Sequence, residues 1–118
     1  MPNPLCHFEL MTSDPAKCKA FYGAVFDWQF DDESMPGYTL IDSGSEPTGA
    51  VFPKPADAPA ACLNAYFKVD DIDAALKTVT EQGGKILIPK TTIPNVGDFA
   101  MFTDPEDIPI GIMQPLEG

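Results

Sequence analysis

Apolar and polar positions along the chain follow either the alternation of a strand or the three- to four-residue spacing of a helix, and each change between the two predicts a new secondary-structure element. From Leu5 to Met11 the two classes alternate, which is typical of a strand with one face toward a core. Asp14 and Pro15 then form a helix start, and apolar residues recur at helical spacing as far as Phe26. Three short strand patterns follow at 28–30, 37–42 and 48–52, separated by turns. The predicted inward stripe of the helix is Cys18, Phe21, Tyr22 and Val25.

The same order of patterns returns after residues 54–60, which are rich in Pro and Ala and predict a linker. Residues 63–69 alternate as a strand, Asp70 and Asp71 offer a helix cap, and Gly83 and Gly84 end the helix. The remaining predicted elements are a short strand at 85–88, a loop at 89–97 that contains a possible lid at 91–97, a strand at 99–103, a turn at 104–107 and a last strand at 108–114.

The chain therefore reads as β-α-β-β-β, a linker, and β-α-β-β-β again. We interpret this order as an internal duplication within one α+β domain that spans residues 1–118. Its modules would be 1–53 and 61–118, joined by 54–60. Two curved mixed sheets of this kind would enclose a cleft, which is the natural place for a ligand.

Charge and composition narrow the possible partners. The chain has 118 residues and a formal net charge of -11, with only 7 Lys and Arg residues. Nucleic acids and anionic membranes both require a cationic surface, so we expect neither as a partner. The first residues carry no positive charge or apolar signal segment, and no apolar run is long enough to span a bilayer. We therefore expect a cytoplasmic protein.

The cysteines give no sign of a disulfide framework or of a redox motif. Cys6, Cys18 and Cys62 are scattered and odd in number, and no two are spaced as CxxC. In a reducing compartment they are expected to be structural thiols. His7 follows Cys6 directly, but neighbouring side chains of a strand point to opposite faces, so the two would not form a catalytic pair.

Several short motifs, in a fixed order, resemble one protein family. They are HFEL at 7–10, AFYG at 20–23, VFDW at 25–28, VDDIDAA at 69–75, QGGK at 82–85 and DPE at 104–106. Together they resemble the glyoxalase/bleomycin resistance/dioxygenase (vicinal oxygen chelate) superfamily, and in particular its glyoxalase-like group. Asp27 stands where the family usually has Gly, and Asp tolerates the left-handed conformation better than most residues. The resemblance covers nearly the whole chain and implies the same two-module fold.

In the metal-dependent members of that family, four side chains on the inner sheet faces hold a divalent ion. Carried over to this sequence, these positions fall at His7, at 49–51, at Asn64 and at Gly111. His7 fits the role, Asn64 is a weak ligand for transition metals, and the other two positions offer no ligand side chain. Since a single His cannot hold Zn, Ni or Fe, we expect no catalytic metal and no cofactor.

The residues expected to carry function lie on the strands. His7 and Glu9 share one strand face and are candidates for a catalytic acid–base pair. The candidate ligand-binding residues are His7, Tyr38, Asn64, Tyr66, Phe102 and Met113.

Three functions remain open, besides that of a structural or regulatory partner domain. The first is binding of a small organic ligand without a catalytic metal, and the acidic chain would suit a cationic ligand. The second is a metal-independent lyase or isomerase that uses His7 and Glu9. The third is a metal-dependent lyase or dioxygenase. The family resemblance also leads us to expect a homodimer.

Overall fold

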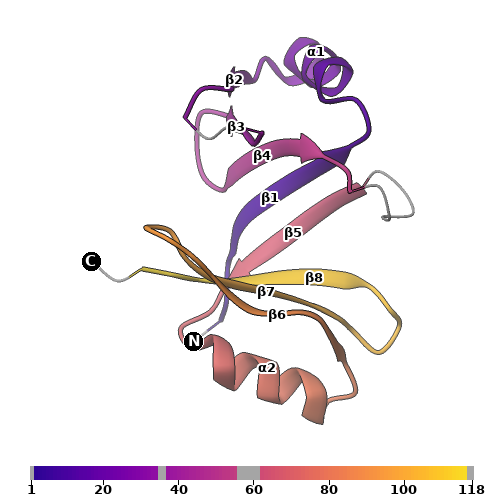
Figure 1. Cartoon of the computed structure of the whole chain (residues 1–118), viewed down its shortest axis with the longest axis vertical. Coiled ribbons are helices and arrows are strands. Elements are labelled where there is room, and N and C mark those ends of the chain that lie inside the picture. Colours follow the sequence, from indigo (N-terminus) through magenta and orange to yellow (C-terminus); the bar gives the residue numbers. More distant parts are fainter. Residues whose placement is uncertain (1, 35–36, 56–61, 117–118) are drawn as a thin grey trace. The chain divides into compact units, whose positions relative to one another are not determined.

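One strand–helix–strand arrangement occurs twice along the chain (Figure 1). The structure is a computed structural model that describes residues 2–34, 37–55 and 62–116. The elements are β1 (Leu5–Thr12), α1 (Pro15–Phe26), β2 (Gln29–Asp31), β3 (Thr39–Asp42), β4 (Thr48–Pro53), β5 (Cys62–Lys68), α2 (Ile72–Glu81), β6 (Lys85–Ile93), β7 (Gly97–Thr103) and β8 (Pro109–Pro115). The predicted α+β class and the order of elements are confirmed.

Internal contacts divide the chain into two compact units. The N-terminal unit is His7–Asn64, and the C-terminal unit consists of the residues up to Cys6 together with those from Ala65 onward. The boundaries between these units fall inside β1 and β5, whereas the predicted linker is 54–60. Of that linker only 54–55 lie within the described residues, and the Lys54 backbone N–H donates to the Thr12 carbonyl at 2.7 Å.

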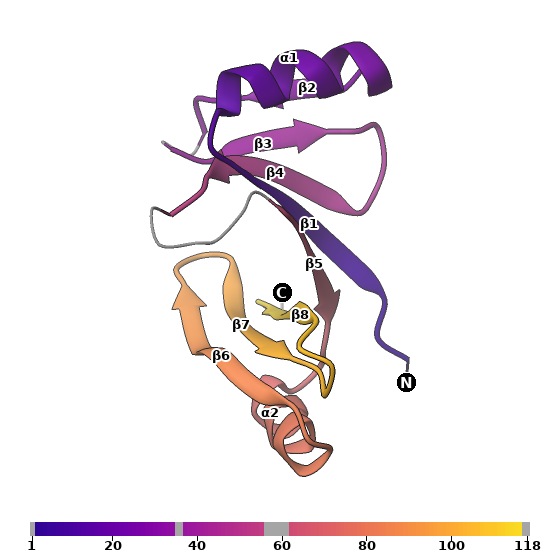
Figure 2. The same ribbon diagram turned by 90° about the vertical axis from the view of Figure 1, so that its right-hand side faces the viewer.

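The half-sheet of the N-terminal unit has the order β2-β3-β4-β1. β1 and β4 run parallel, with His7 beside Thr48 and Glu9 beside Ala50, while β3 is antiparallel to both β4 and β2. Figure 2 shows α1 lying along one face of these strands. On that face Phe8 covers Gly49, because a Cβ atom at Gly49 would lie 2.4 Å from the Phe8 ring. The predicted packing of Phe8 on the helix side is therefore confirmed.

Both ends of α1 are formed by aspartates. Asp14 is the N-cap, and its carboxylate accepts from the Lys17 backbone N–H at 3.1 Å. Asp27 ends the helix in the left-handed conformation, with φ 58°, and its N–H donates to the Gly23 carbonyl. The turn that the family makes with Gly is thus made here with Asp, at some backbone strain.

The stripe predicted for the inner side of α1 is only half correct. Cys18 and Tyr22 are partly buried, whereas 60% of Phe21 and 54% of Val25 are exposed. Trp28 turns back against Phe8 and Tyr22, with ring centroids 5.7 and 5.8 Å away. The indole thus packs against one ring of β1 and one of α1, while Phe21 and Val25 remain on the outside.

The half-sheet of the C-terminal unit has the order β5-β8-β7-β6, with β5 parallel to β8 and the other pairs antiparallel. It repeats the arrangement of the N-terminal unit. α2 begins at Asp71, whose carboxylate accepts from the Ala74 N–H at 3.1 Å, and it covers one face of the strands. The core beneath it consists of Val69, Ile72, Leu76, Ala100 and Ile112.

The segment between α2 and β7 corrects the sequence analysis. Residues 85–93 form one strand, so the predicted loop at 89–97, and with it the proposed lid at 91–97, is wrong. Pro89 is tolerated because β6 lies at the edge of the half-sheet and its register shifts between Ile88 and Thr91. Only a tight turn remains, in which Asn95 takes a φ of 66° and the Val96 N–H donates to the Ile93 carbonyl. None of the helices in the described ranges is long and apolar enough to cross a membrane.

Candidate functional site

Strand pairing in the N-terminal unit brings His7, Glu9, Tyr38 and Thr48 together, and we call these four side chains the polar cluster. Alternation along β1 places His7 and Glu9 on the sheet face away from α1, as predicted. Thr48 joins them because it is the register partner of His7, and Tyr38 joins from the residue just before β3. Ala50 and Phe52, the register partners of Glu9 and Met11, lie beside the cluster on this face, which also carries Asp31 and Asp42 on β2 and β3.

One hydroxyl connects the two ionisable side chains of the cluster. The Tyr38 hydroxyl lies 2.9 Å from His7 Nε2 and donates to Glu9 Oε2 at 2.5 Å. His7 Nε2 and Glu9 Oε2 themselves are 3.7 Å apart. The ring of Tyr38 packs against Phe52, with centroids 5.9 Å apart, and this contact holds the hydroxyl in place.

These contacts are satisfied when His7 carries a proton on Nε2. Tyr38 has a single hydroxyl hydrogen, which it gives to Glu9, so its oxygen must accept from His7 and Nε2 must carry a proton. His7 Nδ1 lies 2.8 Å from Thr48 Oγ1 and accepts from that hydroxyl when the ring is neutral. When the ring is charged, Nδ1 donates instead. Thr48 can serve both states because a hydroxyl both donates and accepts.

The two ionisable side chains of the cluster are largely removed from solvent, whereas Thr48 is exposed. The side chains of His7 and Glu9 are 12% and 11% exposed. Burying a carboxylate is costly unless it is hydrogen-bonded, and here the Tyr38 hydroxyl supplies such a bond. The arrangement can bind a polar group of a ligand, and it can pass a proton between imidazole and carboxylate through one oxygen atom.

The other predicted site residues fall in two further places. Asn64 is buried at the end of the N-terminal unit, where its amide oxygen lies 3.5 Å from the Cys62 sulfur. Tyr66 and Met113 lie in the C-terminal unit on the face away from α2, and the Tyr66 hydroxyl contacts the sulfur of Met101 at 3.8 Å. This second face is lined with aromatic and methionine side chains.

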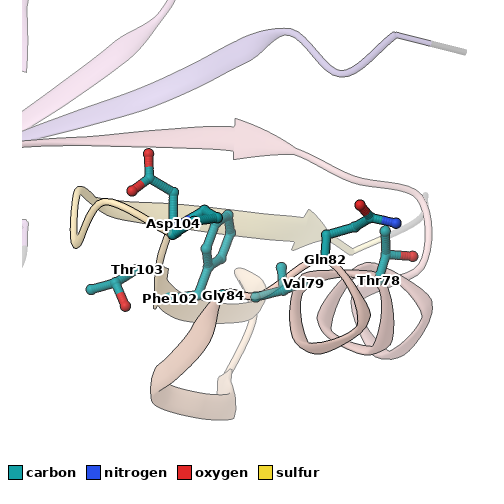
Figure 3. A pocket seen from close by; sticks show the side chains of 8 residues that line it. Thr78, Val79, Gln82, Gly84, Phe102, Thr103 and Asp104 are labelled. Carbon is teal, nitrogen blue, oxygen red and sulfur yellow. The ribbon is translucent and has the colours of Figure 1, made fainter.

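Phe102 does not join Tyr66 and Met113. It lies one residue from Met101 along β7, so it points to the opposite face, where it packs on the core beneath α2. There it lines a hollow of about 230 Å³ beside α2 (Figure 3). A second hollow, of about 380 Å³, shares Phe102, Thr78 and Val79 with the first. Both hollows are mostly apolar, and none of the other candidate site residues lines them.

Two features bear on nucleophiles and metals. Partial burial raises the pKa of the Cys18 thiol above its ordinary value, which makes it a poor nucleophile. Among residues 2–34, 37–55 and 62–116 there is no group of three or more His, Cys, Asp or Glu side chains that could hold a metal ion. At Gly111, where the family would place a ligand, a Cβ atom would lie 2.3 Å from the ring of Tyr66. The described residues therefore do not fit the four-ligand metal centre of the family.

Sequence reasoning missed Thr48. No motif marks this residue, and only the parallel pairing of the first and fourth strands of a module places it beside His7. That pairing follows from the order of a βαβββ module, so the signal was available in the fold class and not in the residue itself.

Comparison with known proteins agrees with this architecture. A family model described as Glyoxalase/Bleomycin resistance protein/Dioxygenase superfamily matches residues 5–112. The chain belongs to this superfamily. Its relatives in the superfamily include a protein named "Putative glyoxylase CFP32", found in Mycobacterium bovis and Mycobacterium tuberculosis, which is 33% identical over 113 residues. That match covers 90% of this chain but only 43% of the mycobacterial protein. A glyoxylase-like domain-containing protein of Didymella fabae is 29% identical, with 83% of each chain covered.

Solved structures of the superfamily fold support the same conclusion. Methylmalonyl-CoA epimerase from Mycobacterium tuberculosis superimposes with a TM-score of 0.71 at 13% identity, covering 97% of this chain and 89% of the epimerase. A hypothetical protein of Bacillus halodurans gives 0.73 at 14% identity, covering 100% and 98%. At these identities the likeness shows the fold alone. The resemblance inferred from the sequence motifs is confirmed at the level of family and fold.

Proposed function

We propose that this chain binds a small organic ligand at the polar cluster of the N-terminal unit, without a catalytic metal. The observation that carries the proposal is the Tyr38 hydroxyl that joins His7 to Glu9 on the sheet face turned away from α1. A sheet face that serves only for packing gains nothing from a buried carboxylate and imidazole, because both must be desolvated. A few convergent polar groups in an apolar setting are the usual composition of a ligand site.

Charge favours a cationic ligand. The chain carries a net charge of -11, and the polar cluster contributes a carboxylate at Glu9. A field of this sign raises the local concentration of small cations and lowers that of anions. The Tyr38 and Phe52 rings next to the carboxylate provide flat apolar surface, and the Tyr38 face can also attract a cation. A small aromatic amine combines these properties.

The side chains at the four metal-ligand positions implied by the family support a site that works without a divalent ion. Two of the four positions implied by the family lack a coordinating side chain, and His7 is the only histidine of the chain. His7 is hydrogen-bonded to two hydroxyls in the structure, through Nδ1 and Nε2. No step of the proposed function passes through a metal.

Three related probes test the proposal, namely benzylamine, benzyl alcohol and benzoate. We expect benzylamine to shift the backbone NMR signals of β1, β3 and β4, benzyl alcohol to do so more weakly, and benzoate not at all. Glu9→Gln removes the charge but keeps the shape, and should abolish the preference for the amine. Tyr22→Phe, a matched change on α1, should leave binding unchanged. Shifts confined to the hollows beside α2, or an equal response to all three probes, would contradict the proposal.

A second candidate function rests on the same hydroxyl. Tyr38 lies within hydrogen-bonding distance of both His7 Nε2 and Glu9 Oε2, so a proton can move between imidazolium and carboxylate by two short transfers. That property suits a metal-independent lyase or isomerase and is not needed for binding alone. His7→Ala separates the two functions: an enzyme would lose turnover with any substrate found, whereas a binder would show weaker binding and no turnover in either form.

A further inference from the structure

The two modules differ on the outer surfaces of their helices. α1 and α2 begin at equivalent aspartates, Asp14 and Asp71, so their positions can be aligned at a constant offset. The outer face of α1 consists of Lys17, Ala20, Phe21, Ala24 and Val25, and all five are exposed. The aligned residues of α2 are Ala74, Lys77, Thr78, Glu81 and Gln82, which are also exposed. The architecture thus permits a polar outer face, and α2 has one, while α1 has an apolar face.

The spacing on the outer face of α1 is that of a helix-packing surface. Residues 17, 20, 21, 24 and 25 follow the i, i+3, i+4, i+7, i+8 pattern and form one stripe. Ala20 and Ala24 are small and let a second helix approach closely, while the exposed Phe21 and Val25 supply apolar area beside them. No described residue covers this stripe.

We propose that the outer face of α1 is a homotypic interface, on which α1 of a second copy of this chain packs antiparallel. Charge identifies the partner. Two chains of net charge -11 repel each other, but α1 contains no acidic residue between Pro15 and Phe26 and contributes Lys17 at one end, while Asp27 follows its other end. In an antiparallel pair with its two-fold axis at Tyr22, Lys17 of each copy lies opposite Asp27 of the other. The same symmetry places Ala20 opposite Ala24, at the point of closest approach.

The geometry of the helix fits this pairing and limits its strength. Lys17 and Asp27 are ten residues apart, about 15 Å along a helix axis, so both pairs form at once only when the two-fold lies midway between them. A helix of 12 residues is about 18 Å long, and one such face offers less than the roughly 800 Å² per partner of a standard stable interface. The expected dimer is therefore reversible, with a dissociation constant on the order of 10 to 100 µM.

Sedimentation equilibrium of the full chain between about 5 and 500 µM tests the interface. Phe21→Thr gives α1 the residue that α2 carries at the aligned position, and it should weaken association at least tenfold while leaving the fold intact, because Phe21 is mostly exposed. Glu81→Ala is the matched change on the outer face of α2, at the position aligned with Ala24, and should have no effect. A chain that stays monomeric over the whole range, or one whose association survives Phe21→Thr, refutes the proposal.

A charge variant separates the specific pairing from bulk repulsion. Asp27→Asn keeps a residue that tolerates the left-handed conformation and lowers the net negative charge. If only bulk repulsion acted, this change would strengthen association. The two symmetric Lys17–Asp27 pairs instead predict weakening by about threefold to tenfold, which corresponds to about 0.3–0.7 kcal/mol for each salt bridge. Lys17→Ala should weaken association similarly, and the double variant should be no weaker than either single one.

The competing occupant of this face is a lipid surface, since apolar and lysine side chains also suit an anionic membrane. Sedimentation with vesicles of phosphatidylcholine and phosphatidylglycerol distinguishes the two. Vesicle binding that depends on Phe21, in a chain that remains monomeric without vesicles, would overturn the homotypic interface. Self-association without vesicle binding supports it.

Discussion

Replacing Tyr38 by Phe removes one oxygen atom from the polar cluster and leaves its ring in place. Two hydrogen bonds disappear, one of 2.9 Å to His7 Nε2 and one of 2.5 Å to Glu9 Oε2. A bond to a charged group contributes about 1.5–3 kcal/mol to stability, and a neutral one about 1 kcal/mol. Nε2 and Oε2 are only 3.7 Å apart, so a small rotation lets them bond directly and recovers part of the loss. We therefore expect the free energy of unfolding to fall by about 2 kcal/mol.

Urea unfolding followed by the fluorescence of Trp28, the only tryptophan, measures this change. Tyr22→Phe is the matched control, because the Tyr22 hydroxyl makes no hydrogen bond to any residue in the described ranges, and it should alter stability by less than about 0.5 kcal/mol. The slope of free energy against urea should be the same in both variants, since the unfolded surface is unchanged. If Tyr38→Phe were as mild as Tyr22→Phe, the hydroxyl would not tie His7 to Glu9, and both proposed functions would lose their supporting observation.

Three further changes follow from local structure. Asp27→Gly removes the backbone strain of a side-chain-bearing residue in the left-handed conformation, so the free energy of unfolding should rise by up to about 1 kcal/mol in a urea titration. A loss of stability would contradict the assigned strain. Gly111→Ala drives a methyl group into the Tyr66 ring and should lower that free energy by about 1–3 kcal/mol, so an unchanged midpoint would refute the contact. Hydrogen bonds from Thr39 and from the Lys19 ammonium hold the pKa of Asp32 in the folded protein below its ordinary value. The ionised Asp32 therefore stabilises the fold at any pH above the pKa that it has in the unfolded chain, and this stabilisation is lost as the pH falls through the lower pKa of the folded protein. Thr39→Val should raise the Asp32 pKa in an NMR titration and move acid unfolding to higher pH.

The element order could be predicted because each boundary carries its own chemistry. Asp14 and Asp71 begin the two helices, and glycines end the second one, as their capping preferences require. Alternation placed His7 and Glu9 on one strand face without any knowledge of the sheet. β6 was misjudged because Pro89 usually ends a strand, and the sequence does not show that this strand lies at an edge, where Pro is tolerated.

The residues of the site could be predicted only in part, because the register between paired strands cannot be deduced from the sequence pattern of either strand alone. The pairing of Thr48 with His7, and of Tyr66 with Gly111, depends on how far each strand slides along its neighbour. The sequence analysis grouped Phe102 with Met113, but the two side chains lie on opposite faces of the sheet. Met113 is paired with Phe99, and Phe102, three residues further along β7, points to the other face. Phe21 and Val25, which lie on the outer face of α1, were assigned to a core stripe with Cys18 and Tyr22, because helical spacing alone does not tell which apolar residues turn inward.

The two units share one arrangement of strands and helix but differ in the chemistry of the sheet faces turned away from their helices. In the N-terminal unit the first strand carries Glu9 beside Ala50, and the space around them is used by hydrogen bonds to Tyr38. In the C-terminal unit the corresponding position of the first strand holds Tyr66, whose ring lies over Gly111. Gly111 is therefore small because an aromatic ring occupies the space that a coordinating side chain would need. A coordinating side chain at position 111 would first require removal of Tyr66, so a ligand there depends on a pair of residues and not on a single substitution.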